Sequence, residues 1–177
     1  MLSREEVNEL IASPKIPKDG SSLLYDQARI KQVYELISQE DSNQRFKLDY
    51  SESNNVSLKL SCHHREFGNL GLVRIDYQGS RHENPQTITA TVPKFLHPFA
   101  GLEIPPRKAH IHIYVEGSEL NWAIPIEDYL ELDSNQRFQL NVPEVLVEAD
   151  KMRAIEDFAR IINLQASFSF LGKLSLN

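Results

Sequence analysis

The feature that most constrains the fold is a two-residue period of apolar and polar side chains over residues 44–61, 70–77 and 109–126. Successive side chains of a β-strand point to opposite faces, so this period predicts strands with one face in the core. Short turn-forming sequences separate these stretches, for example Glu116-Gly117-Ser118. Strands joined in this way pair with their neighbours in sequence, and the pattern therefore predicts an antiparallel β-meander.

Two helices are expected to flank the strands. Ser3 followed three residues later by Glu6 matches a capping box, which predicts a short helix over residues 4–12. Residues 151–164 carry apolar side chains at helical spacing, with Asp150 as the expected N-cap. The expected fold class is thus α+β, an antiparallel β-meander with a short N-terminal helix and a C-terminal helix packed on one face.

The chain of 177 residues is expected to form a single α+β domain over residues 1–177. Residues 86–108 contain four prolines and little alternation, which predicts a long, irregular and exposed loop. Residues 166–177 are expected to form a C-terminal extension with strand character but no evident partner. The spacing of apolar residues in 30–38 suits a helix or a strand, and we favour a strand.

A net charge of −6 and a single cysteine limit the classes of function. An acidic chain is not a general nucleic-acid binder, because phosphate contacts come from clustered lysine and arginine side chains. One cysteine excludes an internal disulfide and a cysteine-based zinc cluster. The N-terminus lacks the basic-then-apolar order of a signal peptide, and no apolar run is long enough to cross a bilayer. We therefore expect a cytoplasmic protein that makes no membrane contact.

The charge is unevenly distributed along the chain. Residues 59–114 carry a net charge of +3 and contain all six histidines, whereas the remaining residues carry −9. An anionic ligand would therefore bind the middle of the chain, where Arg74, Arg81 and Lys108 are candidates to hold a phosphate group. The alternative is that the acidic ends only keep the protein soluble.

Residues 110–116 carry the densest group of chemically reactive side chains. The two-residue period places four of them on one face of the strand, namely His110, His112, Tyr114 and Glu116. Two imidazoles, a phenol and a carboxylate can supply the base, the acid and the orienting group of metal-free acid–base catalysis. A catalytic face of this kind should line a cleft open to solvent. The structural alternative is a polar face that pairs across the sheet or contacts a partner protein.

A metal site is a further possibility for this strand. The spacing His110-x-His112-x-x-x-Glu116 is similar to the first metal-binding motif of the cupins. The glycines that bracket the cupin motif are missing, because residue 104 is isoleucine and residue 123 is alanine, and no second cupin motif is present. We therefore expect neither a bound metal nor another cofactor.

Several segments resemble a family of small uncharacterised bacterial and phage proteins, a domain of unknown function. The resemblance covers most of residues 1–165, and its specific parts are His82-x-Asn84-Pro85 and His110-x-His112-x-Tyr114-x-Glu116-Gly117. A looser resemblance links the same region to the TumE-like toxins of toxin–antitoxin systems. That resemblance implies a small toxin that acts on RNA, with the matching positions His82, Asn84, His110, His112 and Tyr114.

Two hypotheses of different classes follow. One is a mobile-element or phage-type enzyme, a toxin-like metal-independent ribonuclease with RNA as its substrate and an antitoxin as its protein partner. The other is a non-catalytic protein-binding module, such as an inhibitor of a defence system, which contacts its partner through the histidine face or the 86–108 loop.

Overall fold

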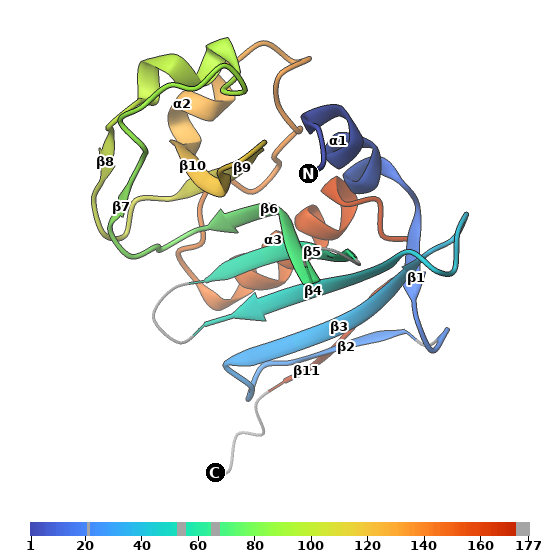
Figure 1. The fold of residues 1–177 in the computed structure, drawn as a ribbon. Coiled ribbons are helices and arrows are strands. Elements are labelled where there is room, and N and C mark those ends of the chain that lie inside the picture. The colour runs from blue at the N-terminus through green and yellow to red at the C-terminus, as the bar shows by residue number, and fades with distance from the viewer. Residues whose placement is uncertain (21, 53–55, 65–67, 173–177) are drawn as a thin grey trace.

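A seven-stranded antiparallel sheet forms the centre of the protein (Figure 1). The computed structural model describes residues 1–20, 22–52, 56–64 and 68–172. The strands of this sheet are β1 (Lys15–Pro17), β3 (Lys31–Ser38), β4 (Arg45–Ser51), β5 (Ser57–His64), β6 (Gly68–Asp76), β9 (His110–Val115) and β10 (Glu119–Pro125). Their order in the sheet is β1-β3-β4-β5-β6-β9-β10, and every pairing is antiparallel. The predicted meander is confirmed, and so is the strand expected over residues 30–38.

Two segments interrupt the meander. The first is β2 (Leu23–Asp26), which pairs in parallel with β11 (Phe168–Leu171). The strand expected in the C-terminal extension, for which the sequence showed no partner, therefore pairs with β2. The second is residues 77–109, called the 77–109 segment below, which leaves the sheet after β6 and returns at β9. It contains β7 (His82–Glu83), the 3₁₀-helix η1 (Lys94–Phe99) and β8 (Glu103–Ile104), and β7 pairs with β8.

The helices are α1 (Arg4–Ala12), α2 (Ile126–Leu130) and α3 (Glu148–Ile161). The start of α1 is as predicted, because the side chains of Ser3 and Glu6 form the reciprocal hydrogen bonds of a capping box. The start of α3 corrects the prediction of Asp150 as the N-cap. Val147 is the N-cap, and Asp150 lies in the first turn, where its carboxylate accepts the backbone N–H groups of Leu146 and Val147.

One face of the sheet forms the hydrophobic core. Leu58, Ile75 and Ile111 lie directly opposite one another on β5, β6 and β9, and each is fully buried. The apolar stripe of α3, including Ile155 and Phe158, packs into the same core. Figure 1 shows α3 running behind the sheet on this face. The two-residue period of the strands and the helical period of α3 therefore bury one common apolar surface.

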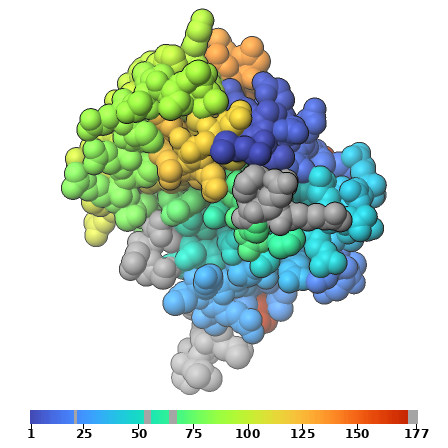
Figure 2. Space-filling model, in the orientation of Figure 1, coloured from blue at the N-terminus to red at the C-terminus, as the bar shows by residue number. Residues whose placement is uncertain are grey.

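The 77–109 segment covers part of the opposite, polar face. The green ribbon of Figure 1 runs beside β9, β10 and α2, and the green surface of Figure 2 lies next to the yellow atoms of this region. Its His82 ring reaches those of His110 and His112 on this face. The prediction of an irregular, exposed loop over residues 86–108 is therefore only partly right. Residues 86–91 are exposed, but Leu96 in η1 and Ile104 in β8 are fully buried. These apolar side chains bind the segment to the molecule despite its prolines.

Among the described residues, no helix is long and apolar enough to span a membrane.

Candidate functional site

The register of β6 against β9 brings charged and imidazole side chains together on the covered face. Asp76 lies opposite His110, and Arg74 lies opposite His112. His82, from β7 in the 77–109 segment, lies with its ring centroid 4.8 Å from that of His112 and 5.8 Å from that of His110. These five residues are called the histidine cluster below. The structure thus brings together three of the predicted histidines and one predicted arginine, and it adds Asp76.

The histidine cluster is buried, and the expectation of a cleft open to solvent is wrong. His110 is 1% exposed, His112 is 5% exposed and Asp76 is 2% exposed. The reason is that the 77–109 segment lies over this face, an arrangement that a strand pattern cannot reveal. His82 and Arg74 are the members that reach solvent, since His82 is half-buried and the Arg74 side chain is 36% exposed.

Two backbone carbonyls determine which ring nitrogens of the buried pair carry protons. Nδ1 of His110 lies 2.8 Å from the carbonyl oxygen of Lys108, and Nδ1 of His112 lies 2.8 Å from that of Leu120. A carbonyl oxygen can only accept a hydrogen bond, so each Nδ1 is the donor. A neutral imidazole then has its lone pair on Nε2, whereas an imidazolium donates a hydrogen bond from Nε2. Both Nε2 atoms face the same oxygen of Asp76, and that of His112 lies within hydrogen-bond distance of it at 3.3 Å.

Asp76 is ionised and held by Arg74. The guanidinium binds both carboxylate oxygens, through Nε to Oδ1 and through Nη2 to Oδ2, each at 2.8 Å. Burial raises the pKa of Asp76, but the hydrogen bond with His112 and the charge of Arg74 outweigh burial and hold this pKa well below its usual range. Burial lowers the pKa of His110, so a neutral imidazole faces an ionised carboxylate.

His82 is held in one tautomer by Asn84. Nε2 of His82 lies 3.0 Å from Oδ1 of Asn84 and 3.2 Å from the carbonyl oxygen of Asn121, and both of these atoms accept a hydrogen bond. Nε2 is therefore the donor, and the hydrogen bonds between described residues leave Nδ1 of His82 without a partner. Burial, followed by the nearby His112, lowers the pKa of His82, so this imidazole is neutral and Nδ1 can accept a proton.

Asn84 has a structural role in addition to its contact with His82. Its Nδ2 donates to the carbonyl oxygens of Phe99 and Ala123, and its Oδ1 accepts the backbone N–H of Ala123. Because β10 is the last strand of the sheet, these bonds satisfy backbone groups that no neighbouring strand can reach. The amide of Asn84 therefore attaches the 77–109 segment to the edge of the sheet.

The other predicted site residues lie outside the histidine cluster. The hydroxyl of Tyr114 donates to the carbonyl oxygen of Leu2, and Glu116 lies in the turn after β9, where its carbonyl oxygen accepts from Thr91. Two of the three predicted anion-binding residues form surface ion pairs, Arg81 with Glu103 and Lys108 with Glu127. Only Arg74 of that group is part of the cluster.

Asp76 is the site residue that the sequence-based prediction missed. The available signal was a carboxylate in an otherwise apolar strand, on the same face as Arg74. Asp76 forms an ion pair with Arg74, and its carboxylate also faces both buried histidines. The pairing of β6 with β9, across a separation of more than thirty residues, is what makes Asp76 part of the site.

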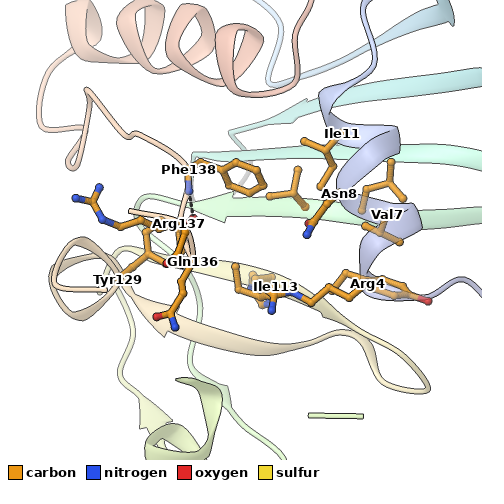
Figure 3. A pocket seen from close by; sticks show the side chains of 14 residues that line it. Arg4, Val7, Asn8, Ile11, Ile113, Tyr129, Gln136, Arg137 and Phe138 are labelled. Atoms are coloured by element: carbon orange, nitrogen blue, oxygen red, sulfur yellow. Dashed lines mark hydrogen bonds between the residues drawn. The ribbon is translucent and has the colours of Figure 1, made fainter. Parts of the chain in front are cut away.

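Two hollows lie near the cluster. A groove of about 710 Å³ is lined by the basic side chains of Arg107, Lys108 and Arg153, together with Glu127 and Glu144. The carbonyl oxygen of Lys108 accepts a hydrogen bond from Nδ1 of His110, so the groove and the cluster meet at this residue. A smaller cavity of about 100 Å³ lies between α1 and the chain after α2 (Figure 3). This smaller cavity is below the size of typical small-molecule sites.

The fold and the cluster define a small α+β protein with a buried centre of three imidazoles, a carboxylate and a guanidinium. Residues 2–163 match a family of unknown function, DUF6978, and the chain belongs to this family. The expectation of an uncharacterised domain is thereby confirmed, and the matched range ends before β11. Comparison with curated proteins and with solved structures finds no significant match.

Proposed function

We propose that the protein is a toxin-like ribonuclease of a mobile element or phage that acts in the cytoplasm, with the histidine cluster as its catalytic centre. The observation that carries this proposal is the convergence of two buried imidazoles on one ionised carboxylate, with the half-buried ring of His82 beside both of them. Burying such groups opposes folding, because polar and charged side chains lose their hydration. Clusters of ionisable groups in such environments are typical of functional sites.

His82 and Arg74 suit the two roles that need contact with a substrate. In RNA cleavage the ribose 2′-oxygen attacks phosphorus, a base takes its proton, and the leaving 5′-oxygen gains a proton. His82 is the base in this proposal, because it is half-buried and its Nδ1 can accept a proton. Arg74 supports the negative charge that develops on the phosphate oxygens. The proton that His82 takes from the 2′-hydroxyl is then the one it returns to the leaving 5′-oxygen, so the imidazole ends the step neutral.

The groove beside the cluster offers cations to a polyanionic substrate. Arg107, Lys108 and Arg153 outnumber Glu127 and Glu144 in its lining, and Lys108, which is paired with Glu127, is two residues from His110. A strand whose phosphates follow these side chains would reach the cluster along the 77–109 segment. The acidic net charge is compatible with this, since the positive charge is concentrated in the middle of the chain.

The test is inducible expression of the wild type beside His82→Ala and the double variant His110→Ala/His112→Ala, scoring growth and the integrity of cellular RNA. We expect growth arrest and RNA cleavage only with the wild type and with the control His63→Ala, an exposed histidine outside the cluster. Thermal denaturation of the purified variants separates loss of activity from loss of folding. Intact RNA after strong expression of soluble wild-type protein would overturn the proposal.

A second candidate function is a non-catalytic binding module that inhibits a component of a defence system. The observation that favours it is the exposed run of residues 86–91, which includes the apolar side chain of Ile88. An antitoxin protein could use the same surface if the protein is a toxin. If the binding module is correct, replacing residues 86–91 by a Gly-Ser linker should abolish partner capture, and the His82→Ala variant should retain it.

A further inference from the structure

We propose that Asp76, His110 and His112 form a binding site for a divalent transition-metal ion such as zinc. The inference deepens the proposed function and rests on the same cluster, but it concerns metal binding and is tested separately from RNA cleavage. The ligand atoms of these three residues all lie within 4.8 Å of one another, and all three side chains are buried.

The direction of the lone pairs is the first argument. Both Nδ1–H groups are committed to backbone carbonyls, so when the two rings are neutral the Nε2 lone pairs of His110 and His112 both face Oδ2 of Asp76. Lone pairs directed at a carboxylate oxygen repel it, unless a cation or a proton lies between them. Metal-bound histidines almost always donate their other ring N–H to a carbonyl or carboxylate, and both histidines have this arrangement.

The distances between ligand atoms are the second argument. Oδ2 of Asp76 lies 3.3 Å from Nε2 of His112 and 3.5 Å from Nε2 of His110. Two ligands that each lie about 2.0–2.1 Å from a tetrahedral zinc ion are about 3.4 Å apart. These two oxygen–nitrogen separations match this value, whereas the ligand nitrogens of the two histidines lie within 4.8 Å of each other. The surrounding strands hold both histidines in place.

The set of donors is the third argument. Two imidazole nitrogens and one carboxylate oxygen leave at least one coordination position open, which is the pattern of catalytic metal sites. The ring of His82 lies 4.8 Å from that of His112, so a third imidazole is close to the open position. Arg74 binds Oδ1 of Asp76 through Nε and Oδ2 through Nη2, so the ion would share Oδ2 with the guanidinium while the bond from Nε orients the carboxylate.

This inference reverses the expectation from the sequence that no metal is bound. That expectation rested on the cupin spacing, in which Glu116 would supply the oxygen ligand. The structure places Glu116 in the turn after β9, away from both histidines, and presents Asp76 from the neighbouring strand. A ligand set drawn from two strands in this register does not follow the cupin motif, so the missing cupin glycines have no bearing on it.

The test begins with the full chain stripped by a chelator and then titrated with zinc or cobalt, by calorimetry and by visible absorption. We expect one ion per chain and a tetrahedral cobalt spectrum, with a rise in melting temperature on binding. The variants Asp76→Asn and His112→Gln should each weaken binding by at least about 10–100-fold, the loss measured when even residues behind metal ligands are removed. His63→Ala, which changes an exposed histidine, should bind as the wild type does.

Each outcome decides between a metal and a proton at this position. If zinc does not bind, or binds equally well to Asp76→Asn and His112→Gln, the inference is overturned and a proton shared within the cluster takes the place of the ion. RNA cleavage by a wild-type protein that binds no zinc or cobalt would overturn the inference and leave the ribonuclease proposal standing. One bound metal ion per chain without any RNA cleavage would support the metal site and overturn the ribonuclease proposal.

Discussion

Asn84 uses its side-chain amide as a substitute for a neighbouring strand. It bonds both the N–H and the carbonyl oxygen of Ala123, as a paired backbone would, and it also bonds the carbonyl oxygen of Phe99. The sequence had marked Asn84 as a catalytic candidate. Its buried hydrogen bonds show that much of its chemistry is already committed to the fold.

Replacing Asn84 by alanine should therefore reduce stability. Three buried backbone groups would lose their partner, and each such group costs about 1–3 kcal/mol, so we expect a total loss of about 2–4 kcal/mol because the site can relax. Urea unfolding measures this loss. Gln86→Ala, two residues further on and exposed, should change stability by no more than about 0.5 kcal/mol. A fully stable but inactive Asn84→Ala variant would restore the catalytic assignment.

Gly79 is required for the position of His110. A Cβ atom at Gly79 would lie 2.4 Å from Cε1 of His110, closer than side chains can approach. We expect Gly79→Ala to displace the buried imidazole and to lower the free energy of unfolding by about 1–3 kcal/mol. The hydrogen bond from Nδ1 of His110 to the carbonyl of Lys108 should weaken, which NMR would detect as faster exchange of the ring N–H.

The control for this variant is Gly172→Ala, where the nearest atom to the added Cβ lies 3.7 Å away. Neither glycine is among those with a positive φ, so alanine strains neither backbone, and only the contact with His110 differs. Equal stability of the two variants would show that His110 has room to move.

At the scale of elements, Lys15 joins three parts of the chain. From β1, its ammonium group donates to the carbonyl oxygens of Ile11 in α1, of Ser13, and of Ile162 at the end of α3. It also lies 4.6 Å from the centre of the Phe46 ring. Helix C-termini have carbonyl groups without partners inside the helix, so one lysine satisfies the ends of two helices.

Burial of Lys15 predicts a specific dependence of stability on pH. Burial lowers the pKa of Lys15 from 10.5 to about 7. Between these values the unfolded chain binds more protons than the folded chain, so the contribution of Lys15 to the free energy of unfolding rises with pH, by at most about 1.4 kcal/mol per pH unit. The measurement is the stability difference between wild type and Lys15→Met from about pH 7 to pH 9. A difference that falls or stays constant over this range would contradict the assignment.

The C-terminal strand β11 lies outside the part of the chain that the family match covers. The match ends at residue 163, and β11 begins at Phe168 and pairs in parallel with β2. The rings of Phe168 and Phe170 meet those of Tyr34 and Tyr25 edge-on, with centroids 5.4 Å and 5.8 Å apart. These aromatic contacts explain why a short strand outside the main sheet is held in place.

For the whole molecule, the 77–109 segment decides what the polar face of the sheet can do. It buries the histidine cluster, contributes His82 to it and lines the basic groove. Its own attachment is uneven along its length. Residues 94–104 are held by η1, by β8 and by buried Leu96 and Ile104, whereas residues 86–91 are exposed and belong to no helix or strand.

Limited proteolysis should reveal this difference. Within the 77–109 segment, we expect a protease of broad specificity to cut first in residues 86–91, because cleavage needs an exposed and locally extended backbone. The two fragments should stay together, since β7 pairs with β8 on opposite sides of the cut. First cleavage within residues 94–104, identified by mass spectrometry, would contradict this account of the packing.

The sequence by itself determined most strands of the main sheet, the helices α1 and α3, and the fold class. These depend on periods of two and of 3.6 residues and on a local capping box, which a short window of sequence contains in full. It also identified His82, His110 and His112, because unusual side chains in one strand and one loop are visible without a structure. The exact start of α3 and the packing of residues 94–104 were not visible in this way.

Only the tertiary structure decided that these histidines form one buried centre. Asp76 joins the centre through strand pairing across a long sequence separation, and Tyr114 and Glu116 leave it because their partners lie at the N-terminus and in a turn. The burial itself comes from the 77–109 segment folding back over the sheet. The membership of this centre and its burial are both consequences of long-range packing. The free energy of burying apolar side chains such as Leu96 and Ile104 determines where the polar side chains of the same segment lie.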